Sequence, residues 1–252
     1  MSNLKEKSLC FNQKIIVALD YKNINEALAF IDNINPKDCK LKVGQEIFTI
    51  NGPSIVKILH DRGFDVFLDL KFHDISYTVS RAVAAAADMG VWMVNIHAIG
   101  GVRMMEAAKN ALKNYSYDAP LLTAVTVLTN LNQLDFNRLG IYINLRKYTK
   151  HLALLSKACG LDGVICSTSE IQELRKACGV DFKLITPGIR ILGDSSDDHE
   201  NIMTPEDAIK KGSDYIVIGR SITRTNNQSF ILKQINNSIN KLYLSKSVSL
   251  NK

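Results

Sequence analysis

One local pattern recurs along this chain and constrains its fold more than any other feature. A stretch with helical periodicity ends at a glycine, and an apolar run begins about two residues later. The glycines that mark the five copies of this pattern are Gly63, Gly90, Gly160, Gly179 and Gly212. A glycine directly after a helix favours the left-handed conformation that ends it, and the short step into an apolar run is typical of a helix-to-strand loop. The repetition therefore predicts alternating helices and strands in a parallel sheet.

Three further apolar runs bring the predicted strands to eight. They cover residues 15–20, 40–44 and 121–127, and join the runs at 65–72, 92–96, 163–166, 182–185 and 215–218. Eight strands alternating with helices predict an α/β protein with the (β/α)8 TIM-barrel fold. No linker divides the chain, so we expect a single domain over 1–252 with flexible ends at about 1–8 and 245–252. A doubly wound open sheet is the alternative, but no Gly-x-Gly-x-x-Gly turn follows the first strand.

Composition disfavours several classes of protein. Of the 252 residues, 46% are hydrophobic and 22% are charged, which is ordinary for a globular protein. No apolar run approaches the roughly 20 residues of a membrane helix, and no signal core follows the N-terminal lysines. The formal charge is +6, but no run of five basic residues occurs, which disfavours nucleic acid as a partner. The five cysteines are scattered without a Cys-x-x-Cys pair, so we expect no disulfide framework, no zinc site and a cytoplasmic location.

The predicted third strand carries two opposite charges on one face. Because side chains alternate along a strand, Phe67, Asp69 and Lys71 share the face that points into the barrel. A buried carboxylate and a buried ammonium are costly unless they are paired, and catalytic groups lie at the carboxyl ends of barrel strands. For this pair alone, a structural ion pair lining the barrel is the alternative.

Two other strands place charges at the same end of the barrel. Asp20 ends the first strand on its inward face, and Lys42 shares one face of the second strand with Lys40. We therefore expect four charges of alternating sign to converge at one barrel mouth: Asp20, Lys42, Asp69 and Lys71. A lysine held between carboxylates stays cationic, so it can stabilise a developing carbanion and then protonate it.

Glycine and arginine occur together after the seventh and the eighth strand. The two segments are Gly188-Ile189-Arg190 and Gly219-Arg220. Loops at these two places form the usual phosphate site of this barrel, where glycines let backbone amides approach and arginine offers a planar fork. The pattern predicts a phosphate site, and ordinary turn glycines with solvated arginines are the alternative.

Six motifs, in order and on the expected strands, closely resemble the bacterial type of the orotidine 5′-phosphate decarboxylase family. They are Val17-Ala18-Leu19-Asp20, Leu41-Lys42-Val43-Gly44, Asp69-x-Lys71-x-x-Asp74-Ile75, Val125-Thr126-Val127-Leu128-Thr129, Thr186-Pro187-Gly188-Ile189-Arg190 and Val217-Ile218-Gly219-Arg220. The resemblance runs from about Ile15 to Thr223. It implies decarboxylation of orotidine 5′-monophosphate to uridine 5′-monophosphate, the last step of de novo pyrimidine biosynthesis. It also implies a homodimer that uses neither a metal nor an organic cofactor.

The resemblance assigns a role to each matching residue. Lys71 would protonate C6 of the pyrimidine, and Asp69 would lie beside the departing carboxylate. Asp20 and Lys42 would bind the ribose. The other matches are Asp74, Ile75 and Thr78, which would reach the neighbouring subunit's site, Thr129 near the pyrimidine amide, and Arg190, Gly219 and Arg220 at the 5′-phosphate.

Two loop positions depart from the family pattern. The family usually has glutamine about nine residues past the arginine of its Gly-Ile-Arg turn, and here that position is His199. A histidine there could still donate a hydrogen bond to phosphate. The family often has Pro-Asn where this chain has Ser76-Tyr77, a change that spares Asp74 and Thr78.

Two other functions stay open on the sequence alone. Metal-dependent sugar-phosphate decarboxylases and aldolases of the same barrel superfamily resemble the Asp-x-Lys-x-x-Asp segment, but they usually have an acidic metal ligand at the position of Lys42. A lysine there repels a divalent cation, which favours the metal-free decarboxylase. A non-enzymatic phosphate-ligand binder or a nucleic-acid-associated protein is suggested only by the basic charge balance.

Overall fold

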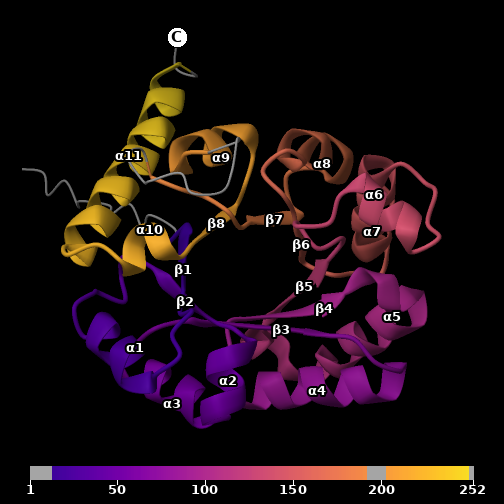
Figure 1. The fold of residues 1–252 in the computed structure, drawn as a ribbon, viewed down its shortest axis with the longest axis horizontal. Coiled ribbons are helices and arrows are strands. Elements are labelled where there is room, and N and C mark those ends of the chain that lie inside the picture. The colour runs from indigo at the N-terminus through magenta and orange to yellow at the C-terminus, as the bar shows by residue number, and fades with distance from the viewer. Residues whose placement is uncertain (1–12, 192–202, 250–252) are drawn as a thin grey trace, which may run out of the picture.

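The strands of this protein form a closed parallel barrel in chain order (Figure 1). A computed structural model describes residues 13–191 and 203–249, with side chains up to residue 244. The strands in these ranges are β1 (Ile15–Ala18), β2 (Lys40–Val43), β3 (Val66–Phe72), β4 (Met93–His97), β5 (Leu121–Val125), β6 (Gly163–Ile165), β7 (Lys183–Thr186) and β8 (Tyr215–Ile218). Because β8 pairs with β1, the ring closes and the predicted (β/α)8 barrel is confirmed.

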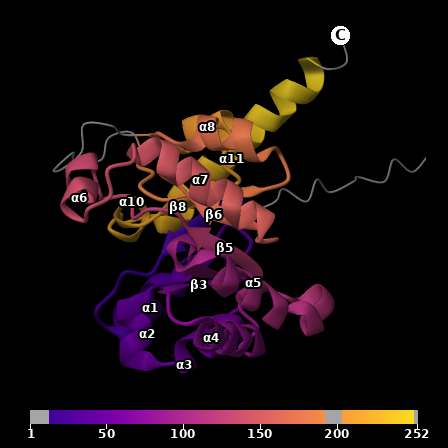
Figure 2. The same cartoon turned by 90° about the vertical axis from the view of Figure 1, so that its right-hand side faces the viewer.

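The helices lie outside the ring of strands (Figures 1 and 2). They are α1 (Ile24–Ile31), α2 (Gln45–Asn51), α3 (Ser54–Asp61), α4 (Ser76–Asp88), α5 (Gly101–Ala111), α6 (Gln133–Arg138), α7 (Leu145–Ala158), α8 (Ile171–Cys178), α9 (Pro205–Lys211), α10 (Arg220–Thr223) and α11 (Gln228–Ser249), with short 3-10 helices at Ala98–Gly100 and Lys113–Asp118. The glycines predicted to end helices all have a positive φ, from 74° at Gly90 to 113° at Gly212. In the part of the chain that the structure describes, no helix is both long enough and apolar enough to cross a membrane.

The C-terminal end differs from the sequence-based expectation. A flexible end was predicted from about residue 245, but α11 continues to Ser249 and projects beyond the barrel (Figure 2). Extending an existing helix costs less free energy than starting one, which explains how a polar end without apolar pattern stays helical. The predicted flexible end at 1–8 and residues 250–252 lie outside the described residues.

Two apolar layers hold the barrel together. The larger layer packs the outward strand faces, including Val66 and Leu68, against the helices. The smaller layer fills the barrel interior with side chains that include Phe67, Met93 and Val217. The alternation predicted for β3 is therefore confirmed for its first residues, and the interior is a packed core rather than a pore.

The two lysines on the inward face of β2 lie at opposite ends of the barrel. Lys40 lies at the amino end, where it pairs with Asp65 and its Nζ lies 4.4 Å from the centroid of the Trp92 ring. Lys42 lies at the carboxyl end. The amino end is thus closed by a structural cation, while the carboxyl end carries the cavity described next.

Candidate active site

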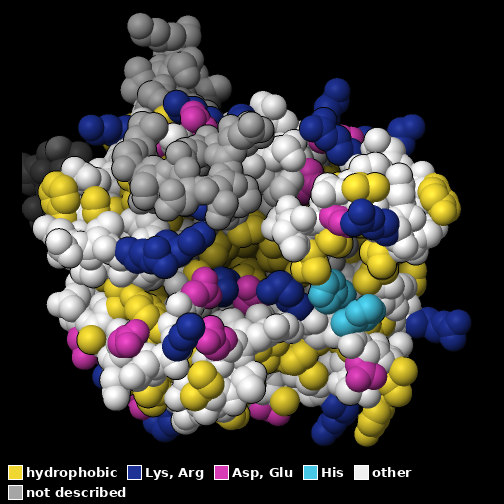
Figure 3. Space-filling model, in the orientation of Figure 1, with side chains coloured by type: hydrophobic (Ala, Val, Ile, Leu, Met, Phe, Trp, Pro, Cys, Tyr) yellow, Lys and Arg dark blue, Asp and Glu magenta, His cyan; other side chains and the backbone are white. Residues whose placement is uncertain are grey.

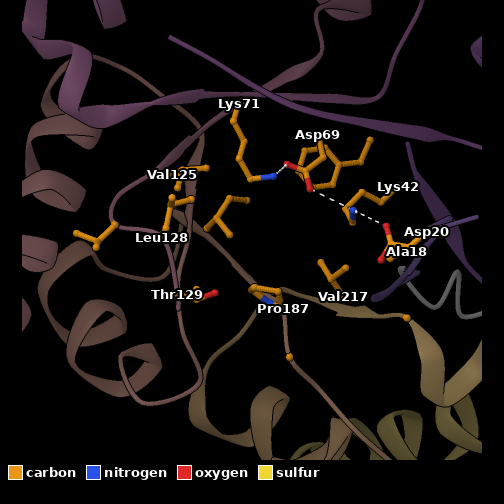
Figure 4. Close-up of a pocket in the computed structure, with 15 residues that line it drawn as sticks. Ala18, Asp20, Lys42, Asp69, Lys71, Val125, Leu128, Thr129, Pro187 and Val217 are labelled. Atoms are coloured by element: carbon orange, nitrogen blue, oxygen red, sulfur yellow. Dashed lines mark hydrogen bonds and ion pairs between the residues drawn. The ribbon is translucent and has the colours of Figure 1, made fainter. Parts of the chain in front are cut away.

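A cavity of about 310 Å³ opens at the carboxyl ends of the strands. Figure 3 shows acidic and basic side chains gathered above an apolar floor in this hollow. The top of the interior core forms the floor through Ala18, Phe67 and Val217. The remaining lining residues are Asp20, Lys42, Asp69, Lys71, Val125, Val127, Leu128, Thr129, Ile165, Pro187, Gly188 and Gly219 (Figure 4).

Four charged side chains of alternating sign follow one another along the cavity wall (Figure 4). Lys42 Nζ lies 3.5 Å from Asp20 Oδ1 and 3.2 Å from Asp69 Oδ2. Lys71 Nζ donates a hydrogen bond of 2.6 Å to the other oxygen of Asp69, Oδ1. The structure therefore brings together the four charges that the sequence predicted to converge.

Asp69 is the most buried acid of this array, with 11% of its side chain exposed. Burial by itself raises the pKa of Asp69. The ammonium groups of Lys42 and then Lys71, with hydrogen bonds from Lys71 and Asn95, act in the opposite direction and outweigh it. The pKa of Asp69 therefore lies below its ordinary value, and the carboxylate is ionised at neutral pH.

Strand β3 bulges where it carries these charges. β3 pairs regularly with β4 as far as Leu68 and Val94, and the pairing resumes at Phe72 and Ile96, so two extra residues lie on β3. Inside the bulge Lys71 has φ of +54°, a left-handed conformation that costs a non-glycine residue about 1–3 kcal/mol. Bulges beside active sites redirect side chains, and here Lys71 lines the cavity.

Asn95 also belongs to this site, although it is not among the residues predicted from the sequence. It is fully buried on β4, accepts a hydrogen bond of 2.8 Å from the backbone N–H of Lys71, and donates one of 2.7 Å to Asp69 Oδ1. A signal was present in the sequence. Alternation along 93–97 places an amide on the same inward face as Met93, beside the charged strand.

The residues predicted at the base and phosphate lie at the cavity or close to it. Thr129 and Gly219 line the cavity. Arg220 directly follows Gly219 as the first residue of α10 and is exposed, whereas Arg190 follows β7 and is half-buried. His199, the predicted loop contact, lies outside the described residues.

The residues predicted to serve a neighbouring subunit lie on an exposed edge, away from the cavity lining. Asp74 follows β3, and its Oδ1 accepts a hydrogen bond of 2.6 Å from the N–H of Ile75. Thr78 is exposed in the first turn of α4. Ile75 and Tyr77 are 71% and 74% exposed, so this edge, residues 74–78, presents large apolar side chains to the outside.

The chemistry of position 42 bears on metal binding. Lys42 places its ammonium against Asp69, where a divalent cation would meet like charge. Among the described residues, no group of three His, Cys, Asp or Glu side chains is arranged to hold a metal ion.

Comparison with known proteins identifies the family. The model of the "Orotidine 5′-phosphate decarboxylase / HUMPS family" matches residues 13–235. Proteins named orotidine 5′-phosphate decarboxylase from Pasteurella multocida and Haemophilus influenzae are 57% identical over 226 residues, covering 90% of this chain and 97% and 98% of theirs. The protein of the same name from Salmonella typhimurium is 54% identical over 227 residues, covering 90% and 93%.

Solved structures agree with the sequence relatives. The crystal structure of orotidine 5′-phosphate decarboxylase from Lactobacillus acidophilus superposes with a TM-score of 0.81 at 34% identity, covering 91% of this chain and all of that one. The family resemblance predicted from the motifs is thus confirmed. This chain belongs to the orotidine 5′-phosphate decarboxylase / HUMPS family.

Proposed function

We propose that this protein decarboxylates orotidine 5′-monophosphate to uridine 5′-monophosphate and CO2, the last step of de novo pyrimidine biosynthesis. One observation carries the proposal above all others. The cavity wall carries four charged side chains of alternating sign: Asp20, Lys42, Asp69 and Lys71. Relatives that are 54–57% identical to this chain are named orotidine 5′-phosphate decarboxylase. The cavity volume lies in the range of small-ligand sites.

Lys71 acts as the proton donor. Loss of CO2 breaks the bond between C6 and the carboxyl carbon, and the electron pair of that bond stays on C6. The Lys71 ammonium stabilises this charge and transfers a proton to C6, and the resulting amine then regains a proton from water. Asp69, ionised and hydrogen-bonded to Lys71, holds the ammonium beside the reacting carbon.

The rest of the cavity binds the nucleotide. Asp20 and Lys42 hold the ribose, and Thr129 lies at the pyrimidine amide. The 5′-phosphate is held by backbone at Gly219 and by the side chains of Arg190, Arg220 and His199. Binding energy from the phosphate, which does not react, helps to assemble the charges around C6.

The proposal includes a homodimer in which each subunit completes the other's site. The edge at 74–78 lies outside the cavity of its own chain, and its apolar side chains, Ile75 and Tyr77, are exposed. A second copy packed on this edge would cover them and bring Asp74 and Thr78 to the neighbouring cavity. Such an arrangement is isologous, because each subunit gives the same residues to the other.

The reaction needs no metal and no organic cofactor. The Lys42 ammonium takes the place where metal-dependent relatives of this barrel need an acid, and its charge repels a divalent cation. We place the activity in the cytoplasm. The described cysteines, Cys39, Cys159, Cys166 and Cys178, are buried free thiols, as is usual in a reducing compartment.

The ultraviolet absorbance of orotidine 5′-monophosphate tests the function directly. The purified protein should convert this nucleotide to uridine 5′-monophosphate, and the rate should be the same before and after exhaustive chelation. Strict dependence on magnesium would move the protein to the metal-dependent relatives. Binding of the nucleotide without turnover would make it a ligand-binding protein.

A further inference from the structure

Among the described residues, Asn95 is the one uncharged side chain with hydrogen bonds to both Lys71 and Asp69. It is 0% exposed, and both of its contacts use the polar atoms of its amide. Oδ1 accepts from the Lys71 backbone, and Nδ2 donates to the same Asp69 oxygen that accepts from Lys71 Nζ. The reverse orientation of the amide would set N–H against N–H and oxygen against carboxylate, so the two partners fix Asn95 in one orientation.

The peptide group between Leu70 and Lys71 is held from both sides by side chains. Its N–H donates to Asn95 Oδ1 at 2.8 Å, and its carbonyl accepts from Gln45 Nε2 at 3.2 Å. This peptide lies inside the bulge, where regular pairing between β3 and β4 is interrupted. The side-chain amides of Asn95 and Gln45 therefore form hydrogen bonds with the N–H and the carbonyl of this peptide, at the point where the regular pairing of β3 with β4 is interrupted.

The held peptide determines the conformation of the residue that carries the ammonium. Lys71 has φ of +54°, which an unrestrained lysine rarely adopts. If Asn95 were apolar, the Lys71 N–H would lose this acceptor, and the bulge would relax toward extended backbone. Lys71 Nζ and Asp69 Oδ1 would then lose the geometry that sets their 2.6 Å hydrogen bond.

We propose that Asn95 is a positioning residue, whose amide locks the bulge of β3 so that the Lys71 ammonium stands at the reacting carbon beside ionised Asp69. The inference rests on the proposed decarboxylation for its kinetic consequence. Asn95 does not line the cavity, so its amide acts on the reaction through Lys71 and Asp69. Its contribution is therefore expected in kcat, because the lysine's alignment matters in the transition state, rather than in KM.

Two substitutions at this position separate the hydrogen bonds from the space that the side chain fills. Asn95→Leu keeps a similar size and removes both hydrogen bonds, and kcat should fall about 10- to 100-fold with KM nearly unchanged. Asn95→Asp keeps the size and the acceptor, but an ionised carboxylate would face Asp69. When protonated, that carboxyl can donate to Asp69 as the amide did.

The pH profile of Asn95→Asp is a readout that a purely structural role would not move. Asp69 accepts a hydrogen bond from Asn95 and is paired with Lys42 of β2 and Lys71 of β3, and His97, two residues further along β4, lies against His73. Measuring the wild type alongside removes the pH dependence that both proteins share. The ratio of the variant's kcat to that of the wild type should rise as the pH is lowered from about 8 to about 6.

Thr123→Val is the matched control. Thr123 is fully buried on β5, is paired in register with Asn95, and donates only to the Val94 carbonyl at 3.3 Å. Its loss removes a buried polar group at the same depth without touching the Lys71–Asp69 pair, so kcat should stay at the wild-type level. A folded Asn95→Leu variant with wild-type kcat would overturn the proposal, and so would an equal loss of kcat in Thr123→Val or a pH profile of Asn95→Asp parallel to the wild type.

Hydrogen exchange at the Lys71 amide, followed by NMR without substrate, tests the same contact independently of catalysis. The amide should be protected in the wild type and in Thr123→Val, and should exchange faster in Asn95→Leu. If the wild type does not turn over orotidine 5′-monophosphate, the proposed function fails while this readout still decides the role of Asn95. Equal protection in all three proteins would contradict it.

Discussion

Burial and neighbouring charges together shift the pKa values of two side chains at the barrel mouth, Asp69 and His97. Asp69 is buried yet ionised, because Lys42 and Lys71 outweigh the effect of burial on its pKa. His97 responds in the other direction. Burial first, and then the neighbouring His73 and Lys71, lower the pKa of His97, whose ring centroid lies 5.4 Å from that of His73. At neutral pH the site therefore combines an ionised Asp69 carboxylate with a neutral His97 imidazole.

The lowered pKa of His97 can be measured by titration. In the wild type, NMR should give His97 a pKa below the ordinary value of about 6.5, and His73→Asn should raise it by removing one cause of the shift. Because the pKa of His97 is lower in the folded protein than in the unfolded chain, its contribution to stability is present above about 6.5 and is lost as the pH falls through the folded pKa. His151→Asn, an exposed change on α7, is the control that should leave His97 unaffected. A wild-type pKa at or above 6.5 would contradict the assignment.

The elements that the sequence predicted most accurately are those encoded by local periodicity. The glycine after each of five helices ends it in the structure, and β8 has the predicted bounds. Strand β3 shows where local pattern is insufficient. Alternation placed Asp69 and Lys71 together on the inward face, but it contains no sign of the bulge between Leu68 and Phe72. The bulge depends on β4 and on side chains 24 or more residues away in the chain, which periodicity does not record.

The site was predictable to the extent that strand ends determine it. Asp20 lies two residues past β1, Lys42 is the next-to-last residue of β2, and Asp69 lies in the middle of β3. The carboxyl ends of parallel barrel strands meet at one barrel mouth. Asn95 was missed because a single amide inside an apolar strand resembles an ordinary core position. The setting of Arg190 and Arg220 depends on loop conformation, which strand periodicity does not encode.

The two ends of the barrel differ in structure. Lys40 with Asp65 and Trp92 closes the amino end, and the cavity with its charges occupies the carboxyl end. The edge at 74–78 follows the carboxyl end of β3 but does not line the cavity of its own chain. In our proposal this edge makes the dimer, rather than the barrel alone, the unit of catalysis.

Subunit complementation tests the proposed sharing of residues between subunits. Lys71→Ala and Asp74→Ala should each be nearly inactive alone. A mixed dimer pairs the intact Lys71 of one subunit with the intact Asp74 of the other, so one of its two sites is complete. Coexpression in equal amounts should therefore restore about one quarter of the wild-type activity, since about half of the dimers are mixed. A coexpressed sample no more active than the two variants alone would show that Asp74 does not act across an interface.

The proposed protonation of the reacting carbon by the Lys71 ammonium is tested by the kcat of Lys71→Ala with orotidine 5′-monophosphate. The variant should fold, as judged by circular dichroism, and its kcat should fall roughly 10⁴-fold or more, because the proton donor and the charge that stabilises the carbanion are lost together. Lys109→Ala, which breaks a 2.9 Å lysine–aspartate pair with Asp162 outside the cavity, should keep the wild-type kcat. A folded Lys71→Ala variant with near-normal kcat would show that Lys71 is not the proton donor.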